Sequence, residues 1–376
     1  MVKNRESNFE LMRIISMLLI VLFHVLSYSG YLAKATGFML YFLLLIKSIT
    51  LMHVNSFILL SGYFQNNSKM KLSKMVSLNN ETWFYKSLIA IIFLIFNLYQ
   101  TIPTKTEILQ NLLPIDFGIY WFIGAYIVLY LISPILNKSI KHFSKKEHKS
   151  IIIIIIFILS FLCLITVDTF YNNNFGRSLS TFVLLYFIGA YMNKYPIEKN
   201  KYVKQMTIKR KKAYCLSTIL ICSIIGSTIG LISLKISGIS SILDYISRML
   251  CYFSTSYSSP IVLIQSIAYF IFFKTIKINS QFINKVASCV FGVYLIHENK
   301  YVREILYNKI GLTTIKTINI KSILYLLIVV IIIFIICIII EFIRKIIFNF
   351  FYNLNISSKI RKKISQFVEK KLSLTW

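Results

Sequence analysis

The amino-acid sequence predicts an all-α, polytopic membrane protein with about ten transmembrane helices and both termini in the cytoplasm. Hydrophobic residues make up 57% of the 376 residues, and charged residues only 15%. A soluble domain of this size keeps roughly a quarter of its residues charged, so lipid must surround most of this chain. Helices satisfy their own backbone hydrogen bonds in lipid, and long unbroken apolar runs favour helices over the alternating strands of a barrel.

Apolar windows of about 17–22 residues, each long enough to cross a hydrocarbon core of about 30 Å, recur along the chain. The window near Leu40 contains Lys47 and His53, and the window near Ala287 becomes polar from His297 onward. Even so, the expected number of spans is about ten. The windows begin near Leu11, Leu40, Thr82, Gly118, Ser150, Ser178, Ala213, Tyr257, Ala287 and Ser322.

The basic residues predict the orientation of these spans. The formal net charge is +29 at pH 7, from 42 Lys and Arg against 13 Asp and Glu. With the N-terminus inside, 29 of the basic residues fall in cytoplasmic segments and ten in outer segments. This loop-by-loop alternation is the positive-inside bias of membrane proteins. It identifies the lipid bilayer as a partner and disfavours nucleic acid.

The chain is expected to contain one membrane domain, residues 1–346, and a basic amphipathic cytoplasmic tail, residues 347–376. The tail places Ile356 and Ile360 among Lys359 and Arg361, a pattern typical of a helix lying on the inner leaflet. The six cysteines form no metal-type pairs, and no phosphate-binding glycine loop is present, so neither a metal nor a permanently bound cofactor is expected. The first window carries ionisable residues that an export signal does not need, so we expect it to be retained.

The first window also holds the densest set of ionisable residues, namely Glu10, Arg13 and His24. Ionisable groups at the bilayer centre cost at least about 2–3 kcal/mol, so each is a candidate site residue. At about 100° per residue, the three lie on one stripe of a helix. At about 1.5 Å per residue, Arg13 and His24 are about 16 Å apart along the axis.

This spacing suits a reaction with one substrate entering from each side of the membrane. A guanidinium at the inner mouth can hold a phosphate-bearing donor, and an imidazole can act as a general base toward a hydroxyl. A gap of about 16 Å is on the order of a pantetheine arm, so a coenzyme A thioester could span it. The competing interpretation is structural, with His24 bonded to a neighbouring helix and an Arg13–Glu10 pair that anchors the helix at the interface.

Other polar residues are candidates for an acceptor cleft. Tyr294, His297, Tyr301 and Glu304 follow one another at steps of three and four residues along the ninth window. Such a stripe suits sugar hydroxyls, although it also fits the wet outer end of a helix. Trp121 could stack on a sugar or belong to the aromatic belt at the membrane interface.

Five blocks, in order along the chain, resemble the acyltransferase-3 family of membrane acyltransferases. The first runs from an acidic residue, Leu, an apolar residue and Arg through ten residues to a Phe-His pair. The ordered set covers nearly the whole chain. The blocks are Glu10-Leu-Met-Arg13 with Phe23-His24, Phe57 to Tyr63 with Ser61-Gly62, Tyr120-Trp121-Phe122 with Pro134, Leu185 to Ala190, and Phe291 to His297.

The resemblance implies transfer of an acyl group, usually acetyl from cytoplasmic acetyl-CoA, to a hydroxyl of an extracytoplasmic glycan. It implies a multi-pass protein of the bacterial cytoplasmic membrane, with His24 as the catalytic residue and Arg13 as its partner on the donor. Many members have an Arg-x-x-Arg after the second helix, whereas this chain has Lys71-Leu-Ser-Lys74. Lysine can bind a phosphate as a point charge, but it lacks the planar, two-pronged guanidinium of arginine. Donor binding by this loop and a role only in membrane orientation are therefore equally good interpretations.

His53 and Asn55, in the second window, are supporting candidates that could equally serve helix packing. Three functions stay open at this point. They are an O-acyltransferase acting on capsule, wall or exported polysaccharide, a transferase acting on a lipid-linked sugar, and a glycan transporter or flippase without chemistry. The absence of repeated halves in the sequence disfavours the transporter. The acceptor, the acyl chain and the oligomeric state do not follow from the sequence.

Overall fold

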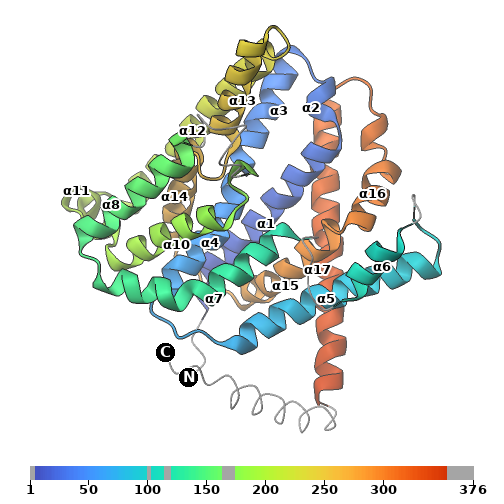
Figure 1. The fold of residues 1–376 in the computed structure, drawn as a ribbon, viewed down its shortest axis with the longest axis horizontal. Helices are drawn as coiled ribbons and strands as arrows, with labels where there is room; N and C mark the ends of the chain where they lie inside the picture. The colour runs from blue at the N-terminus through green and yellow to red at the C-terminus, as the bar shows by residue number, and fades with distance from the viewer. Residues whose placement is uncertain (1–4, 100–102, 114–119, 163–173, 354–376) are drawn as a thin grey trace.

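The computed structural model describes residues 5–99, 103–113, 120–162 and 174–353, which contain helices and no strand. The predicted all-α fold is confirmed for these residues (Figure 1). Most of the predicted tail lies outside them. The helices are α1 (Ser7–Tyr28), α2 (Tyr31–Lys34), α3 (Gly37–Thr50), α4 (Met52–Gln65), α5 (Leu72–Ile95), α6 (Lys105–Leu112), α7 (Trp121–His142), α8 (Lys145–Ile156), α10 (Leu179–Lys194), α11 (Lys201–Gln205), α12 (Ile208–Ile236), α13 (Ser241–Thr255), α14 (Pro260–Lys274), α15 (Gln281–His297), α16 (Lys300–Lys309) and α17 (Ile320–Asn353). A π-helical segment, η1 (Phe157–Leu162), follows α8, and three short 3-10 turns are η2 (Asn174–Gly176), η3 (Ile197–Lys199) and η4 (Leu312–Thr314).

Six of the described helical segments are long and apolar enough to cross a membrane, so the protein is multi-pass. The remaining windows of the sequence fall on α5, on α8 with η1, on α10 and on α15, which are shorter or more polar. The total of ten spans stays a prediction. The six segments are Ser7–Tyr28, Gly37–Gln65, Trp121–His142, Ile208–Ile236, Ser241–Lys274 and Ile320–Phe350.

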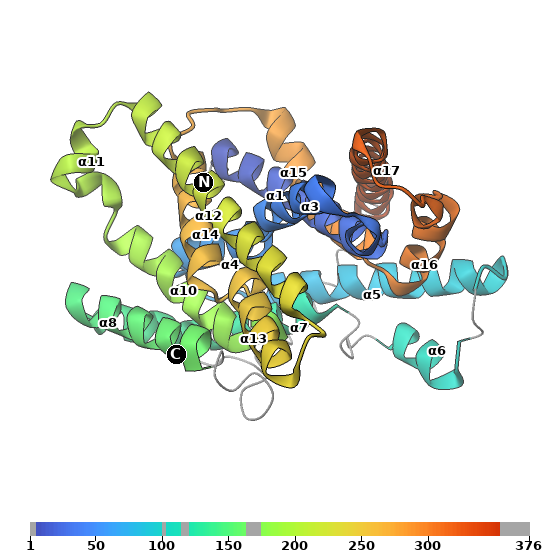
Figure 2. The same ribbon diagram turned by 90° about the horizontal axis from the view of Figure 1, so that it is seen from above.

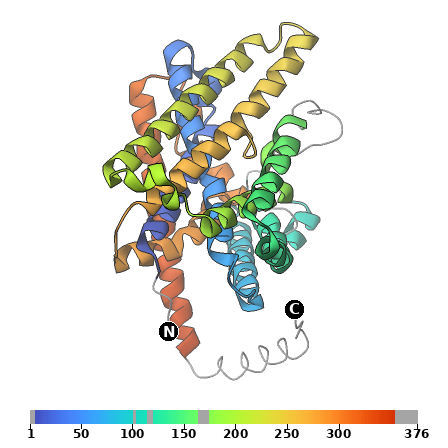
Figure 3. The same ribbon diagram turned by 90° about the vertical axis from the view of Figure 1, so that its left-hand side faces the viewer.

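Helix α17 shows why the chain needs lipid around it. Its outward isoleucines, among them Ile331, Ile335 and Ile339, are about half exposed in the bare protein. A continuous apolar face of this length is stable only against hydrocarbon. The helix continues to Asn353, past the expected domain boundary at residue 346. Figures 1 and 3 show it projecting beyond the other helices, on the side of the molecule where α1 begins.

Helix α1 lies at the centre of the bundle, in contact with α3, α4, α14, α15 and α17. Figure 2 shows it between α15 on one side and α4 and α14 on the other. Helices α4 and α10 pack with their backbones touching, because a Cβ at Gly62 would overlap the carbonyl oxygen of Tyr186. Small residues allow such close approach between membrane helices. The glycine of the Ser-Gly block near the end of α4 therefore permits the close approach of α10.

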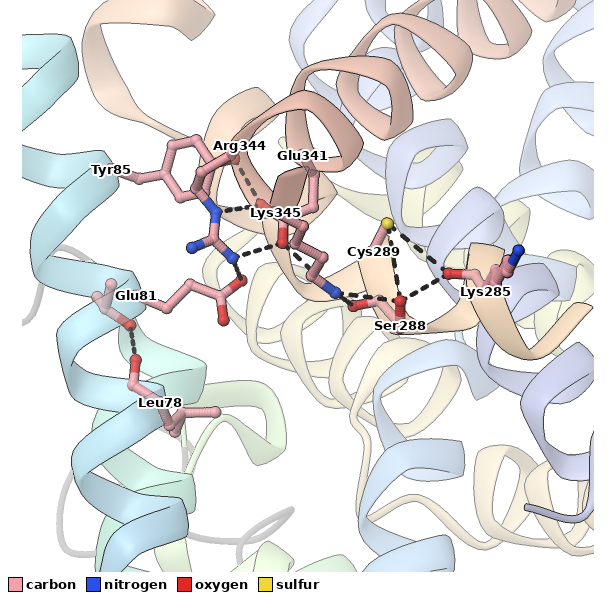
Figure 4. Close-up of polar contacts among 10 residues, drawn as sticks. Leu78, Glu81, Tyr85, Lys285, Ser288, Cys289, Glu341, Arg344 and Lys345 are labelled. Atoms are coloured by element: carbon pink, nitrogen blue, oxygen red, sulfur yellow. Dashed lines mark hydrogen bonds and ion pairs between the residues drawn. The ribbon is translucent and has the colours of Figure 1, made fainter. Parts of the chain in front are cut away.

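A buried ion-pair cluster joins α5 to α17 (Figure 4). The guanidinium of Arg344 donates to both carboxylate oxygens of Glu341, at 2.7 and 2.6 Å. It also lies 3.2 Å from Glu81, and Tyr85 donates to Glu341 at 2.6 Å. Glu341 is fully buried, and a bidentate pair with further hydrogen bonds is what a buried carboxylate requires. The cluster therefore holds α5 at a fixed position beside α17.

The same end of α17 also contacts α15. Lys345 donates to the carbonyl oxygen of Ser288 and, at 3.1 Å, to its hydroxyl (Figure 4). Arg5, just before α1, donates to the carbonyl of Asn284 at 3.5 Å. The start of α1, the start of α15 and the end of α17 thus meet on one side of the molecule.

Candidate active site

A cavity of about 360 Å³ runs alongside α1. Glu10, Arg13 and His24 all line it, as their helical spacing predicts. Met17 and Ile20 lie between them and give the middle of the cavity an apolar wall. A cation at one end, a histidine at the other and an apolar stretch between them could accommodate an elongated ligand.

At the first end, Arg13 donates to Glu10 through a 2.9 Å ion pair. The Glu10 side chain is 9% exposed and the Arg13 side chain 38%, so the guanidinium remains accessible to a ligand. Leu78 of α5 and Ser288 of α15 complete this end of the cavity. Both belong to the region held by the ion-pair cluster of Figure 4, which therefore shapes the Arg13 end.

The lysine pair predicted to meet the donor lies next to this end rather than in it. Lys71 precedes α5, and its backbone is tied to Tyr130 by hydrogen bonds of 2.9 and 3.2 Å. Lys71 and Lys74 are exposed and are not among the described residues that line the cavity. Leu78, which does line it, lies one helical turn beyond Lys74. The Lys74 side chain therefore starts from the same face of α5 as a cavity residue.

At the other end, one ring nitrogen of His24 faces two partners. Its Nδ1 lies 3.0 Å from Nε2 of His297 and 2.9 Å from a carboxylate oxygen of Glu298. The contact with His297 has the geometry of a hydrogen bond, whereas the contact with Glu298 meets only the distance of an ion pair. The His297 side chain is fully buried, and its Nδ1 lies 2.6 Å from the carbonyl oxygen of Val293.

These contacts assign the protons. A carbonyl oxygen only accepts, so Nδ1 of His297 must donate to Val293. Nε2 of a neutral His297 is then an acceptor, and Nδ1 of His24 must carry the proton that it shares with His297. The carboxylate of Glu298 also requires a proton on that nitrogen. In the neutral imidazole, both partners therefore leave Nε2 of His24 with a free lone pair, the state that a general base or a nucleophile needs.

Glu298 is itself held in place. Arg303 lies 2.9 Å from its second carboxylate oxygen, and Tyr28 donates to that oxygen at 3.1 Å. The guanidinium of Arg303 also covers the Tyr28 ring at 4.6 Å and donates to its hydroxyl at 2.8 Å. A carboxylate fixed beside the imidazole stabilises the imidazolium that forms when His24 takes a proton.

Three predicted candidates line the cavity near His24, and a fourth contacts a wall residue. Trp121 and Tyr294 are in the wall, so either could contact an acceptor. His53 also lines the cavity, with its Nε2 3.3 Å from the hydroxyl of Tyr257, a further wall residue. Asn55 donates to the backbone carbonyl of Tyr257 at 2.9 Å. His53 thus contacts the side chain of Tyr257, and Asn55 holds its backbone.

The prediction that one continuous helix carries the stripe from Tyr294 to Glu304 is wrong. Helix α15 ends at His297, and Asn299 caps a separate helix, α16, by accepting from the Tyr301 N–H at 3.1 Å. His297 bonds to His24 rather than to open space. Tyr301 accepts from Asn111 at 2.9 Å, and neither Tyr301 nor Glu304 is among the described residues that line the cavity.

Beside Tyr301, the ammonium of Lys300 lies 2.8 Å from Glu107 of α6. The hydrogen bond from Lys300 lowers the pKa of the Glu107 carboxyl. This exposed pair ties α16 to α6 away from the cavity.

Two residues at the His24 end are not among those that the sequence predicts. Glu298 could have been identified from the sequence, since this acidic residue directly follows the histidine that ends the last of the five blocks. No sequence feature marks Arg177 as a site residue, because it lies in a connection between helices. It lines the cavity, with its guanidinium 6.0 Å from the Trp121 ring.

The same three groups have the spacing of a metal-ion site. The facing atoms of His24, His297 and Glu298 lie within 4.8 Å of one another. A metal there would bind Nδ1 of His24 in place of the shared proton. Either the shared proton or a metal ion could occupy the space between Nδ1 of His24 and its two partners.

A protein-family model described as an acyltransferase domain matches residues 6–342. The match covers nearly the whole chain and includes Arg13, His24, Arg177 and Glu298. The comparisons found no match among curated proteins or solved structures.

Proposed function

Since the chain belongs to the acyltransferase-3 family and is therefore an acyltransferase, we propose that it transfers an acetyl group from cytoplasmic acetyl-CoA to a hydroxyl of an extracytoplasmic glycan. The observation that carries this proposal is that Arg13 and His24 line opposite ends of the same cavity. The positive-inside charge pattern supports placing the Arg13 end at the cytoplasmic face of a bacterial cytoplasmic membrane.

The Arg13 end suits the phosphate groups of the donor. The guanidinium is accessible, and Ser288 and Arg5 line the same end. Arg13 can offer two parallel N–H groups to a phosphate, the geometry in which arginine exceeds lysine. The apolar middle of the cavity would then hold the pantetheine arm, whose length matches the axial separation of about 16 Å between Arg13 and His24.

The His24 end suits the transfer step. Nε2 of His24 takes the proton of the acceptor hydroxyl while the hydroxyl oxygen attacks the thioester carbonyl. The new C–O bond forms, the C–S bond breaks, and the coenzyme A thiolate leaves with the proton returned by His24. Glu298 and His297 hold the imidazole in the required tautomer throughout. A route through an acyl-histidine would use the same free nitrogen.

The proposal is tested with purified protein in detergent, labelled acetyl-CoA, and surface polysaccharide from a strain that lacks the protein. We expect label in the polysaccharide, unchanged by a metal chelator, and mass spectrometry of the product to show an added acetyl group. No transfer to this acceptor, with binding of glycan but no use of acetyl-CoA, would instead favour a transporter.

Arg13→Ala is expected to raise the KM for acetyl-CoA by about 10- to 100-fold, because hydrogen bonds to a charged group are lost. The kcat should fall less, since Arg13 is remote from His24. Arg13→Lys should recover part of the affinity as a point charge. Lys277→Ala, which removes an exposed basic residue outside the cavity, is the matched control. A lower kcat with an unchanged KM for acetyl-CoA would show that Arg13 does not bind the donor.

A further inference from the structure

The His24 end of the cavity contains a positive charge that the transfer step does not use. Arg177 lines the cavity there and is exposed to solvent. Arg13 and Arg303 each pair with a carboxylate, Glu10 and Glu298 respectively. Within the described part of the chain, Arg177 forms no ion pair. A cation that lines a binding cavity and pairs with no carboxylate of the described residues is suited to an anionic ligand.

The position of Arg177 is fixed by long-range packing. Gly176, directly before it, has a φ of +79°, and a Cβ there would lie 2.9 Å from the backbone N of Ser258 and the Cβ of Tyr257. The backbone N–H of Tyr257 donates to Phe175 at 3.1 Å. The backbone directly before Arg177 thus packs against the turn before α14. Arg177 therefore reaches the cavity from a fixed position.

An aromatic platform lies beside this guanidinium. The Trp121 ring lies 6.0 Å from Arg177 and 6.2 Å from the Tyr257 ring, at an angle of 15° between the two rings. Trp121, Tyr257 and His24 line the same cavity. A sugar ring can stack on an indole, and a guanidinium beside it can bind a carboxylate or a phosphate through two N–H groups.

We propose that the acceptor glycan is anionic, with a uronate carboxylate or a phosphate bound by Arg177 near the sugar that stacks on Trp121. This inference rests on the proposed function and deepens it by naming the acceptor class. The anion is held at the opposite end of the cavity from the donor phosphates. Arg177 therefore selects among acceptors, while His24 acts on the hydroxyl of whichever acceptor is bound.

The test measures acetyl transfer from labelled acetyl-CoA to matched acceptors, namely neutral hexose oligosaccharides, their uronate counterparts and their phosphate-substituted counterparts. We expect kcat/KM to favour one of the acidic series by about 10- to 100-fold. Arg177→Gln should remove that preference by raising the KM for acidic acceptors far more than the KM for neutral ones. Arg177→Lys should keep part of the preference, and Lys300→Gln, which removes an outer charge away from the cavity, should keep all of it.

The two acidic arms distinguish their sources, because a carboxylate preference indicates a uronic acid polymer and a phosphate preference a phosphate-bearing or lipid-linked glycan. Equal use of neutral and acidic acceptors by the wild type would overturn the inference while leaving the proposed function intact. An equal loss with every acceptor in Arg177→Gln would also overturn it, since that result indicates a role in the transfer step or in folding. Failure of the wild type with all three series would count against the proposed function itself, and the inference falls with it.

Discussion

Replacing His24 with alanine is expected to lower acetyl transfer by about 10²- to 10⁴-fold, because a positioned general base contributes a factor of that size. The variant lacks the only atom assigned to remove the acceptor proton, the free Nε2 of the imidazole. Transfer to polysaccharide from labelled acetyl-CoA measures the loss. The donor affinity should change little, since the Arg13 end of the cavity stays intact.

Two controls make this result specific. His142→Ala removes an exposed histidine at the end of α7, outside the cavity, and should retain full activity. Thermal unfolding of His24→Ala in detergent shows whether the variant folds, and binding of acetyl-CoA shows whether its donor site persists. A folded His24→Ala protein with normal acetyl transfer would remove His24 from the mechanism.

Replacing Glu298 with glutamine is expected to lower kcat by about 10²- to 10³-fold. The loss of the negative charge destabilises the imidazolium that forms in the transfer step, and in serine proteases the equivalent change costs about 10⁴. The smaller effect is expected here because His297 still accepts the proton on Nδ1 of His24. The KM for acetyl-CoA should stay near the wild-type value.

Glu107→Gln is the matched control for this change, since it neutralises an exposed carboxylate that pairs with Lys300 away from the cavity. Arg303→Gln adds a second comparison. It leaves the Glu298 carboxylate in place but removes one of its anchors, so its effect on kcat should be smaller than that of Glu298→Gln. A kcat unaffected by Glu298→Gln would mean that His297 alone sets the tautomer of His24.

The sequence was sufficient to predict the features that depend on one helix. The shared face of Glu10, Arg13 and His24 follows from the helical repeat, which is local, and the structure places all three in one cavity. Each apolar window likewise depends only on the composition of its own segment, which determines whether that segment can lie in lipid. What one helix presents to a ligand can therefore be derived before any tertiary contact is known.

The features that the sequence did not predict depend on where helices end and on what packs against them. The stripe from Tyr294 to Glu304 assumed a continuous helix, but the chain turns at Glu298 and Asn299, and this turn brings the carboxylate to His24. Arg177 reaches the cavity only because its connection is seated on the turn at Tyr257, 80 residues later in the chain. Neither placement has a periodic pattern from which it could be predicted.

In the proposed mechanism, one cavity brings a donor and an acceptor together from opposite sides of the membrane. Sealed liposomes test it most directly, with surface polysaccharide from the deletion strain trapped inside and labelled, membrane-impermeant acetyl-CoA added outside. We expect labelled polysaccharide in the lumen, protected from an esterase added outside and missing with His24→Ala. Label appearing only on polysaccharide added outside with the donor, or polysaccharide crossing the membrane without consumption of acetyl-CoA, would contradict it.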